Sequence, residues 1–353
     1  MTQNQSIQTV IGWDIGGAHL KAVLLDAAGY VLAVSQVYCP LWRGLHELDL
    51  AMDVILHEFN AEKHVVTMTG ELADIFPNRH AGVVQIAQFV AQKLSSQTPS
   101  CTVGFYAGNQ GVVGIEAVEP HSAEIASMNW LASVQHIAHN VEQALFIDMG
   151  STTTDIALVK GGRTQVRGFN DATRMQYDEL VYTGVVRTPL MALAQKIPYA
   201  GQQVNVAAEH FATTADVYTL TGDLAPAENM TETADGAEKS IEASARRIAR
   251  MIGQDAQCAQ LSAWRNLAGA FKQAQLNLIK QAVLTQISRL EDCENLQLIG
   301  AGVGEFMVLE LAKQLGLKYV SVGDFIHAEN YAIKNMAQVC FPAYAVAGLG
   351  FKS

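Results

Sequence analysis

The sequence is poor in charged residues, and the charges it does carry are mostly negative. Only 16% of the 353 residues are charged, and 34 acidic against 23 basic residues give a formal net charge of −11. Binding to nucleic acid or to an anionic membrane surface needs positive potential. The composition therefore argues against nucleic acid and membranes as partners.

Long apolar runs, a signal-like start and paired cysteines are also missing. There is no run of about 18 uninterrupted apolar residues, so we expect no transmembrane helix. The polar residues 1–9 lack the basic-then-apolar pattern of a secretory signal. The five cysteines are scattered without a Cys-x-x-Cys pair, which favours reduced, buried thiols over a zinc site or a disulfide framework. We expect a cytoplasmic protein.

What the chain does have is enough apolar length for two domains. Half of its residues are hydrophobic, and domains typically hold about 100–200 residues. Strand-like and helix-like segments alternate in its first part, which indicates an α/β layer around a mixed sheet. The expected strands are 11–26 (a hairpin), 31–37, 65–70 and 101–106, and the expected helices are 44–60 and 82–95.

Residues 145–159 combine two short apolar strands with a polar turn between them. The turn holds Asp148, Gly150, four hydroxyl residues (151–154) and Asp155. Glycine lets the backbone approach a ligand closely, and hydroxyl and amide groups donate to phosphate oxygens. Carboxylates would repel a phosphate unless a divalent cation such as Mg²⁺ lay between them. Taken alone, this stretch could equally be an ordinary hairpin with a polar turn.

The same pattern occurs near the N-terminus. Residues 10–26 contain an apolar strand, then Asp14, Gly16 and Gly17, then a second apolar strand; the shared Asp-hydrophobic-Gly frames begin 134 residues apart, at Asp14 and Asp148. This repetition predicts two similar domains that face one nucleotide or diphosphate. Asp14 and Asp148 would then hold Mg²⁺ through water across the cleft. A third glycine-rich turn, with Gly300, Gly302 and Gly304, follows another apolar strand and precedes a helix, where helix N–H groups can meet an anion or a purine.

The pattern restarts near residue 144, which we take as the domain boundary. The first domain would span residues 1–144 and the second 145–353, with a helical insertion. A long helix at 121–142 would precede the second hairpin. Behind it we expect strands at 164–169 and 180–186, helices at 189–196 and 209–220, a polar loop at 222–236, and a helical region at 237–289 broken near 253–257.

Three segments, Asp14-Ile-Gly-Gly17, Asp148 to Asp155 and Gly300 to Gly304, resemble the two phosphate loops and the adenosine loop of the superfamily of actin, Hsp70 chaperones and sugar kinases. Within it, the chain resembles the hydantoinase/oxoprolinase-related branch. It is most similar there to proteins encoded with tetrahydromethanopterin-linked one-carbon genes, and to archaeal methanofuran-biosynthesis enzymes. Segments 67–74, 182–189 and 211–218 carry this closer resemblance, which extends over nearly the whole chain.

The resemblance implies a fold and an activity. The fold would be α/β, with duplicated actin-like (ribonuclease H-like) domains, mixed sheets flanked by helices and a central cleft; the final helix, about 340–353, would pack back on the first domain. The archaeal relatives join an aminomethylfuran diphosphate to a tyramine derivative. We therefore expect a Mg²⁺-dependent transferase that forms an aryl ether with a tyrosine- or tyramine-type phenol and releases pyrophosphate. Phosphate oxygens would be bound by Gly16, Gly17, Gly150, Ser151, Thr152 and Thr153, and a flat ring by Gly300, Gly302 and Gly304.

Other side chains are candidates for the chemistry. Lys21 could pair with a phosphate as a point charge. Asp155 could be a second metal anchor, a general base, or merely a cap of the hairpin, and Glu71 is an alternative base. His19 is a structural group or a catalyst. The acceptor would be bound by Arg187, Thr213 and Asp216.

Two departures from the superfamily pattern bear on ATP. Ala18 and His19 stand where nucleotide-binding relatives often carry Thr or Ser, and the third loop lacks the usual adjacent glycine pair. ATP is therefore a doubtful cofactor, and both departures suit a different diphosphate. The same loops are compatible with two alternatives: an ATP-dependent kinase or hydantoinase-like hydrolase, and a non-catalytic regulator that binds a nucleotide. The sequence leaves the oligomeric state open, a homo-oligomer included.

Overall fold

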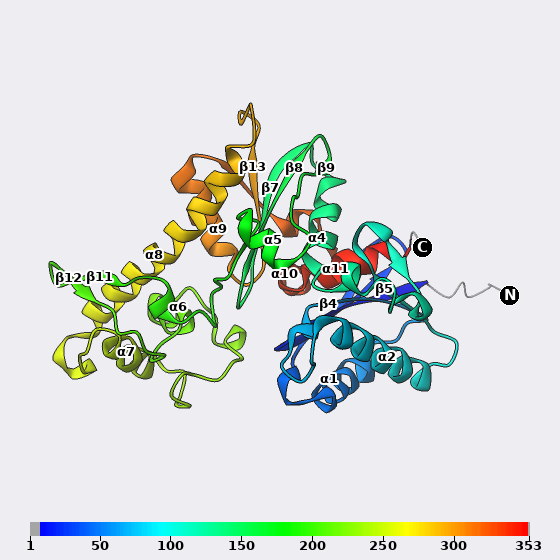
Figure 1. Ribbon diagram of the computed structural model, residues 1–353, viewed down its shortest axis with the longest axis horizontal. Coiled ribbons are helices and arrows are strands. Elements are labelled where there is room, and N and C mark those ends of the chain that lie inside the picture. The colour runs from blue at the N-terminus through cyan, green and yellow to red at the C-terminus, as the bar shows by residue number, and fades with distance from the viewer. Residues whose placement is uncertain (1–7, 352–353) are drawn as a thin grey trace.

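The computed structural model describes residues 8–351, which form two large sheets and a helical part (Figure 1). The first sheet has the order β15-β3-β2-β1-β4-β5-β6. Its central strands β1, β4 and β5 run parallel, while β2 and β3 continue antiparallel from β1. The strands are β1 (Thr9–Ile15), β2 (His19–Asp26), β3 (Tyr30–Tyr38), β4 (Lys63–Met68), β5 (Thr102–Tyr106), β6 (Val112–Val113) and β15 (His327–Ala328).

The second sheet repeats the opening hairpin of the first. Its order is β10-β8-β7-β13-β14, with β9 paired to β8, and β7 runs parallel to β13. The strands are β7 (Gln143–Met149), β8 (Thr154–Lys160), β9 (Arg163–Thr164), β10 (Leu180–Val181), β13 (Gln297–Ala301) and β14 (Lys318–Ser321). Two mixed sheets, each opening on a hairpin, therefore match the duplication expected from the sequence.

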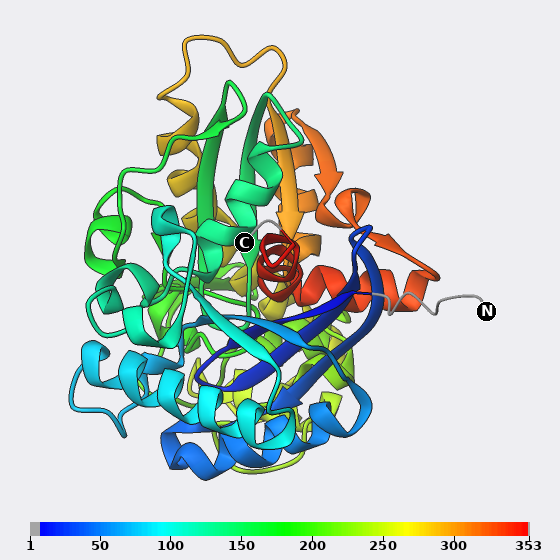
Figure 2. The same cartoon turned by 90° about the vertical axis from the view of Figure 1, so that its right-hand side faces the viewer.

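Strand alternation divides the first sheet into two buried faces. Ile11, Trp13 and Ile15 share one apolar cluster with α1 (Leu45–Glu58) and α2 (Arg79–Gln97). Val10 belongs to another cluster with α4 (Asn129–Ala138) and α11 (Phe341–Leu349), which also includes Phe146 of the second sheet. α4 and α11 therefore lie between the two sheets, as Figure 2 shows.

The C-terminal helix α11 approaches the first sheet very closely. A Cβ atom at Gly12 of β1 would collide with the carbonyl of Ala343 and the backbone of Ala347. A glycine is thus required at position 12, because backbone meets backbone there. The preceding helix, α10 (Tyr331–Val339), packs near β3, and β15 pairs with β3. The end of the chain therefore returns to the first sheet.

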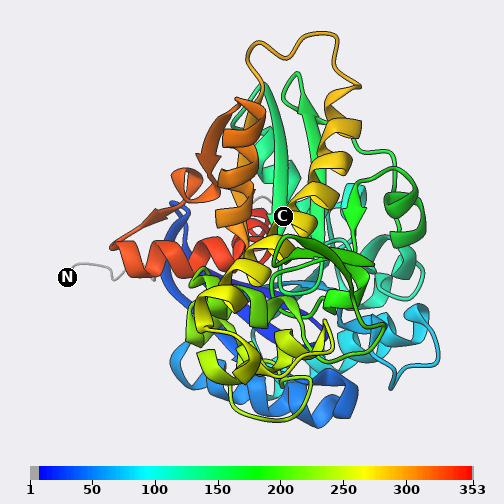
Figure 3. The ribbon, with the colours of Figure 1, turned by 90° about the vertical axis from the view of Figure 1, so that its left-hand side faces the viewer.

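The other face of the second sheet carries the helical part. α8 (Leu261–Ile287) and α9 (Glu305–Leu315) cover Leu145 and Ile147, and α6 (Thr214–Thr221) and α7 (Ile241–Arg250) pack beside α8 (Figure 3). A small hairpin, β11 (Lys196–Tyr199) and β12 (Gln202–Asn205), also packs on α8. Among the described residues, no helix is both long and apolar enough to cross a bilayer.

Several expected elements differ from the structure. The expected helix 121–142 is divided into α3 (Ser122–Ile125) and α4, because Ser127 between them adopts a left-handed φ of 55°. The expected strand 180–186 is only β10; the residues after it bend to bond the second hairpin loop instead. The expected strand 164–169 is reduced to β9.

Two further boundaries also move. Residues 189–196 form a single 3₁₀ turn at Leu190–Ala192, followed by strand β11 rather than a helix. The helix expected from residue 209 begins at Thr214, where Thr213 and Asp216 form a capping box that fixes its start. The break near 253–257 is confirmed, since α7 ends at Arg250 and α8 begins at Leu261. The remaining helix is α5 (Asp171–Gln176).

Candidate functional site

The two hairpin loops have the same backbone geometry. Asp14 pairs with Lys21 across the first hairpin, and Asp148 pairs with Asp155 at the equivalent place in the second. In the first loop the amide of Gly16 donates to the carbonyl of His19, and in the second the amide of Gly150 donates to that of Thr153, each over 2.9 Å. The sequence repeat is therefore a structural repeat, residue for residue.

Each loop is held from behind by its own domain. The carbonyl of Gly17 accepts from the amide of Leu41 (3.0 Å) in the first loop. The carbonyl of Gly150 accepts from Val185 (3.1 Å), and that of Ser151 from Val186 (3.0 Å), in the second. In each of these hydrogen bonds the loop contributes a carbonyl oxygen and the neighbouring segment contributes the amide.

The carboxylates at the loops are buried close to one another. The side chain of Asp14 lies 4.0 Å from Lys21 Nζ and accepts a hydrogen bond from Asn129 (3.3 Å). Burial raises the pKa of Asp14 in spite of Lys21. Burial, followed by the charge of Asp155, raises the pKa of Asp148 to about 7, and the charge of Asp14 adds to this. The metal-free site therefore disfavours the ionised form of its own carboxylates.

This donor set fits a hydrated divalent cation. Within residues 8–351, no group of three or more His, Cys, Asp or Glu side chains is arranged to bind a metal ion directly. The loops therefore do not provide a complete set of protein ligands for a metal ion. However, Mg²⁺ usually keeps several waters and needs only one or two carboxylates. Asp14 and Asp148, whose pKa values are raised by burial and by neighbouring negative charge, suit such a cation.

Lys21 is the cation built into the site. Burial alone would lower its pKa, but the negative groups around it, Asp14 above all, raise the pKa above its ordinary value. Its Nζ also donates to the carbonyl of Val339 at the end of α10, over 3.1 Å. Lys21 is therefore charged at neutral pH and tied to the C-terminal segment.

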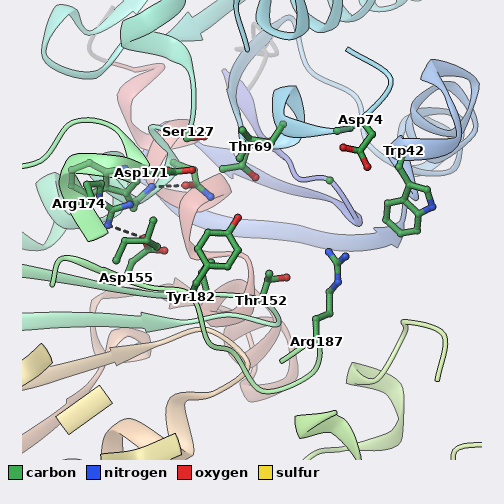
Figure 4. Close-up of a pocket in the computed structure, with 17 residues that line it drawn as sticks. Trp42, Thr69, Asp74, Ser127, Thr152, Asp155, Asp171, Arg174, Tyr182 and Arg187 are labelled. Carbon is green, nitrogen blue, oxygen red and sulfur yellow. Dashed lines mark hydrogen bonds and ion pairs between the residues drawn. The ribbon is translucent and has the colours of Figure 1, made fainter. Parts of the chain in front are cut away.

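A cavity of about 410 Å³, here called the aromatic cavity, opens on one side of the loops (Figure 4). Gly17, Thr152, Thr153 and Asp155 reach it from the two loops. Its other walls carry three aromatic side chains and several charged ones. They include Trp42, Trp130, Tyr182, Asp74, Asp171, Arg174 and Arg187.

Tyr182 and Arg187 project into this cavity from the segment after β10. In Figure 4 the Tyr182 ring points toward Thr69 and the Arg187 guanidinium toward Trp42. The Cζ of Arg187 lies 5.8 Å from the centroid of the Trp42 ring, within the range of a cation–π contact. Tyr182 keeps 57% of its surface exposed. Flat apolar surface and a guanidinium thus face the same space.

Asp155 lies on the cavity wall but is already paired. The buried Arg174 donates to its Oδ1 over 2.8 Å and to the carbonyl of Glu179 over 2.9 Å. Its Cζ also stands 3.8 Å from the centroid of Trp130. Arg174 therefore fixes the orientation of Asp155 on the aromatic cavity.

The loops also line a second cavity of about 360 Å³, here called the His19 cavity. His19, Lys21, Asp148, Gly150 and Ser151 line it from the two hairpins. Its remaining walls are mostly apolar and come from the 225–230 segment and α10. Beyond Gly302 it adjoins a further hollow of about 440 Å³, which shares that residue, Glu228 and Asn335. The two hairpins therefore contribute residues to both cavities.

The glycines of the third loop mainly allow close packing. A Cβ at Gly302, where φ is +81°, would collide with Asp148, and one at Gly304 would lie 2.5 Å from Met149 Cγ. A Cβ at Gly300 would lie 3.0 Å from the Tyr319 ring. Of the three, Gly302 lines the His19 cavity. The third loop thus supports Asp148 from behind.

Seven predicted site residues line neither cavity: Asp14, Gly16, Glu71, Thr213, Asp216, Gly300 and Gly304. Glu71 is buried, accepts from Ser127 Oγ over 2.5 Å, and has its pKa raised to about 7 by burial; Ser127, not Glu71, lines the aromatic cavity. Thr213 and Asp216 form the cap of α6, and Asp216 pairs with the buried Arg247 over 2.7 Å. The contacts of Glu71, Thr213 and Asp216 are therefore structural ones, with other side chains and with the start of a helix.

Sequence reasoning missed Trp42, Trp130, Arg174 and Tyr182 as cavity residues. Tyr182 does stand in a segment with family resemblance, so it had a signal. Trp130 and Arg174 come from different elements, α4 and α5, and had none. No local pattern could link them, because their contact exists only after the two segments have packed.

Comparisons with known proteins agree with this architecture. Residues 62–332 match the family model described as hydantoinase/oxoprolinase. A (4-{4-[2-(gamma-L-glutamylamino)ethyl]phenoxymethyl}furan-2-yl)methanamine synthase of Methanocaldococcus jannaschii is 29% identical over 282 residues, covering 79% of this chain and 82% of the relative. The synthase of the same name from Methanococcus vannielii is 28% identical over 169 residues, covering 48% and 75%.

A solved structure supports the fold independently. The nucleotide-free structure of an ATP-dependent acetone carboxylase aligns with a TM-score of 0.56 at 11% identity, covering 97% of this chain and 70% of that one. With two mixed sheets flanked by helices, this likeness confirms the expected actin-like α/β fold. Because the family model matches well over half of its length, the chain belongs to the hydantoinase/oxoprolinase family.

Proposed function

We propose that this chain is a synthase of methanofuran biosynthesis that forms an aryl ether. The donor would be an aminomethylfuran diphosphate and the acceptor a tyrosine- or tyramine-type phenol, with pyrophosphate released. Both curated relatives are named as synthases of a furan methanamine that carries a phenoxymethyl group. That group contains the ether bond whose formation we assign to this chain.

The observation that carries the proposal is the arrangement of two phosphate-type loops beside an aromatic cavity. In the reaction, the CH₂–O bond of the donor breaks and its electron pair leaves with pyrophosphate. The phenol oxygen then forms the new C–O bond. Because a furan ring stabilises positive charge on that carbon, the enzyme's main task is to stabilise the departing pyrophosphate.

The residues of the loops suit that task. Lys21 is partly buried and charged beside Asp14 and Asp148, and the loop amides and the Ser151 hydroxyl can donate to phosphate oxygens. Asp14 and Asp148 would hold Mg²⁺ through water, and the cation would neutralise the diphosphate. Fixed donors of this kind favour the charge that develops in the transition state.

The aromatic cavity suits the organic groups. Trp42 and Tyr182 offer flat faces for a furan or a phenol, and Arg187 offers two parallel donors to a carboxylate. The acceptor portion in the relatives' name includes a glutamyl group, which carries a carboxylate. Asp155 is the carboxylate that both ends a loop and lines this cavity, so we assign it the phenolic proton.

The test is pyrophosphate release from aminomethylfuran diphosphate and Mg²⁺ in the absence of ATP, with and without a phenolic acceptor. We expect release that depends on the acceptor and is abolished in Asp148→Ala. Asp53→Ala is the matched control, because that carboxylate forms an exposed pair with Lys93 far from the loops. No release by the folded protein, together with ATP hydrolysis, would instead favour a kinase or hydrolase.

A second experiment tests the acceptor side. Arg187→Gln should raise KM about tenfold for acceptors with a carboxylate, such as tyrosine or γ-glutamyltyramine, and leave tyramine unaffected. Arg43→Gln is the control, since Arg43 pairs with Glu232 at the surface. Equal changes for all acceptors would contradict the assignment of Arg187.

A further inference from the structure

His19 is a buried histidine on the wall of a cavity, and one of its ring nitrogens has no hydrogen-bond partner. It is 9% exposed and lines the His19 cavity. Its Nε2 is one of four buried side-chain atoms in the described chain without a hydrogen-bond partner. Leaving a buried polar atom unpaired costs about 1–3 kcal/mol, so such an atom in a native structure calls for an explanation, and a water, an ion or a functional role are the usual ones.

The second hairpin shows what the position is for. His19 occupies the place that Thr153 occupies in the second loop, with the same backbone bond to the loop glycine. Thr153 presents a hydroxyl at the loop, and His19 presents a ring nitrogen. Each cavity is therefore lined by a hydrogen-bonding side chain from the equivalent loop position, Thr153 in the aromatic cavity and His19 in the His19 cavity.

The surroundings of His19 favour an anion. Burial, followed by the positive charges of Lys21 and Arg187, lowers its pKa to about 4, so the ring is neutral at neutral pH. The ring of Tyr38 meets the His19 ring edge-on at a centroid distance of 6.0 Å. Both charged groups acting on the ring are thus cations.

A second buried histidine shows the contrast. His64 is also buried, and burial lowers its pKa to about 4. Its Nδ1, however, accepts a hydrogen bond from Trp13 Nε1 over 3.1 Å. His64 is therefore a satisfied core residue, whereas His19 Nε2 is not.

We propose that His19 binds the leaving pyrophosphate directly, with its Nε2–H donating to a phosphate oxygen in the His19 cavity beside Lys21 and Ser151. The inference rests on the function proposed above. The neutral imidazole gives a hydrogen bond and transfers no proton. The electron pair of the broken C–O bond moves to the pyrophosphate oxygen, and the phenolic proton goes to Asp155.

This assignment also orients the substrates. In a displacement, the nucleophile approaches the carbon from the side opposite the leaving group. With pyrophosphate in the His19 cavity, we place the phenol in the aromatic cavity, the other cavity that the loop residues line. The leaving group and the attacking phenol are thus assigned to different cavities.

The experiment measures binding of pyrophosphate with Mg²⁺ to the full chain by calorimetry. His19→Gln places an amide nitrogen near the position of Nε2 and should bind within about threefold of wild type. His19→Phe and His19→Asn cannot donate from that position and should bind about 10- to 100-fold more weakly, the usual range for a hydrogen bond to a charged group. His64→Gln is the matched control and should bind like wild type.

The outcomes separate the two proposals. If wild type binds Mg²⁺-pyrophosphate and His19→Phe and His19→Asn bind equally well, the role of His19 is wrong while the proposed function stands. If folded wild type neither binds pyrophosphate nor releases it from the donor, the proposed function itself fails. Thermal melting establishes whether each variant is folded. If His19→Phe does not fold, His19→Asn provides the test.

Discussion

The two hairpins of this protein share a backbone but differ in one charge. In the first, Asp14 faces Lys21 across the strands; in the second, Asp148 faces Asp155 at the same register. The first pair is neutral within its own hairpin. The second brings two carboxylates together, and Asp155 is neutralised instead by Arg174 from α5.

Because Asp155 stands where the first hairpin has Lys21, the second hairpin lacks a positive charge beside Asp148. The charge of Lys21 acts on both Asp14 and Asp148, yet the pKa of Asp148 still rises to about 7. A duplicated hairpin has therefore diverged into one charge-balanced half and one half with excess negative charge. The excess lies where Mg²⁺ and a diphosphate are proposed to bind, and the predictions below test that asymmetry.

The largest effect is expected from the unbalanced carboxylate. Asp148→Asn should lower kcat for pyrophosphate release about 10²- to 10³-fold, because it removes the anchor proposed for Mg²⁺. Steady-state assays over a range of Mg²⁺ concentrations check this. A variant that keeps wild-type kcat and Mg²⁺ dependence would show that the second hairpin does not hold the cation.

In the first hairpin, where Lys21 balances Asp14, we expect the activity to depend on the charge of Lys21. Lys21→Met should lower kcat about 10- to 100-fold, because one fixed positive charge near the leaving group is lost. Lys21→Arg preserves the charge and should retain more activity than Lys21→Met. If the two variants are equally impaired, the position acts through packing and the bond to Val339 rather than through charge.

The loops should also differ in their tolerance of added bulk. Gly184 supports the second loop from behind, and a Cβ there would lie 2.5 Å from the backbone of Ser151 and Thr152. Gly184→Ala should therefore cost about 1–3 kcal/mol of unfolding free energy and lower the pyrophosphate affinity.

Gly17 of the first loop is the control for this substitution. A Cβ at Gly17 would have no heavy atom within 4 Å, so Gly17→Ala should leave the unfolding free energy measured in urea unchanged. If Gly184→Ala and Gly17→Ala destabilise the protein equally, crowding around the added Cβ is not what sets the cost.

The smallest expected effect is a pH dependence of stability. Burial and Asp155 raise the pKa of Asp148 from 3.8 to about 7, so the folded protein disfavours its ionised form. The stability that this group contributes is complete below about pH 4 and is lost as the pH rises through 7. Metal-free wild type should therefore lose a few degrees of Tm between pH 4 and 8 relative to Asp148→Asn.

Added Mg²⁺ supplies the control for the pH experiment. At pH 8 it should raise the Tm of wild type, because the cation favours ionised Asp148, and it should have little effect on Asp148→Asn. Parallel pH curves for the two proteins would show that Asp148 ionises as freely in the folded state as in the unfolded chain.

Much of the fold could be predicted from local patterns. Alternating apolar residues gave β1, β2, β7 and β8, and the repeated Asp-x-Gly turn gave the duplication. Boundaries were less accurate where contacts from elsewhere decide them. For example, residues after Val181 look strand-like, but their amides bond to Gly150 and Ser151 of the second loop instead of to a neighbouring strand.

The sequence by itself determined the two hairpins with their carboxylates, because strand alternation, glycine turns and the spacing from Asp14 to Lys21 act within a few residues. Only the tertiary structure decided how those groups are used. The pairing of Asp155 with Arg174, the unpaired Nε2 of His19 and the two cavities that the loops line depend on contacts between distant segments. Burial then sets the charges, since removing a carboxylate from water changes its pKa by more than its sequence neighbours do.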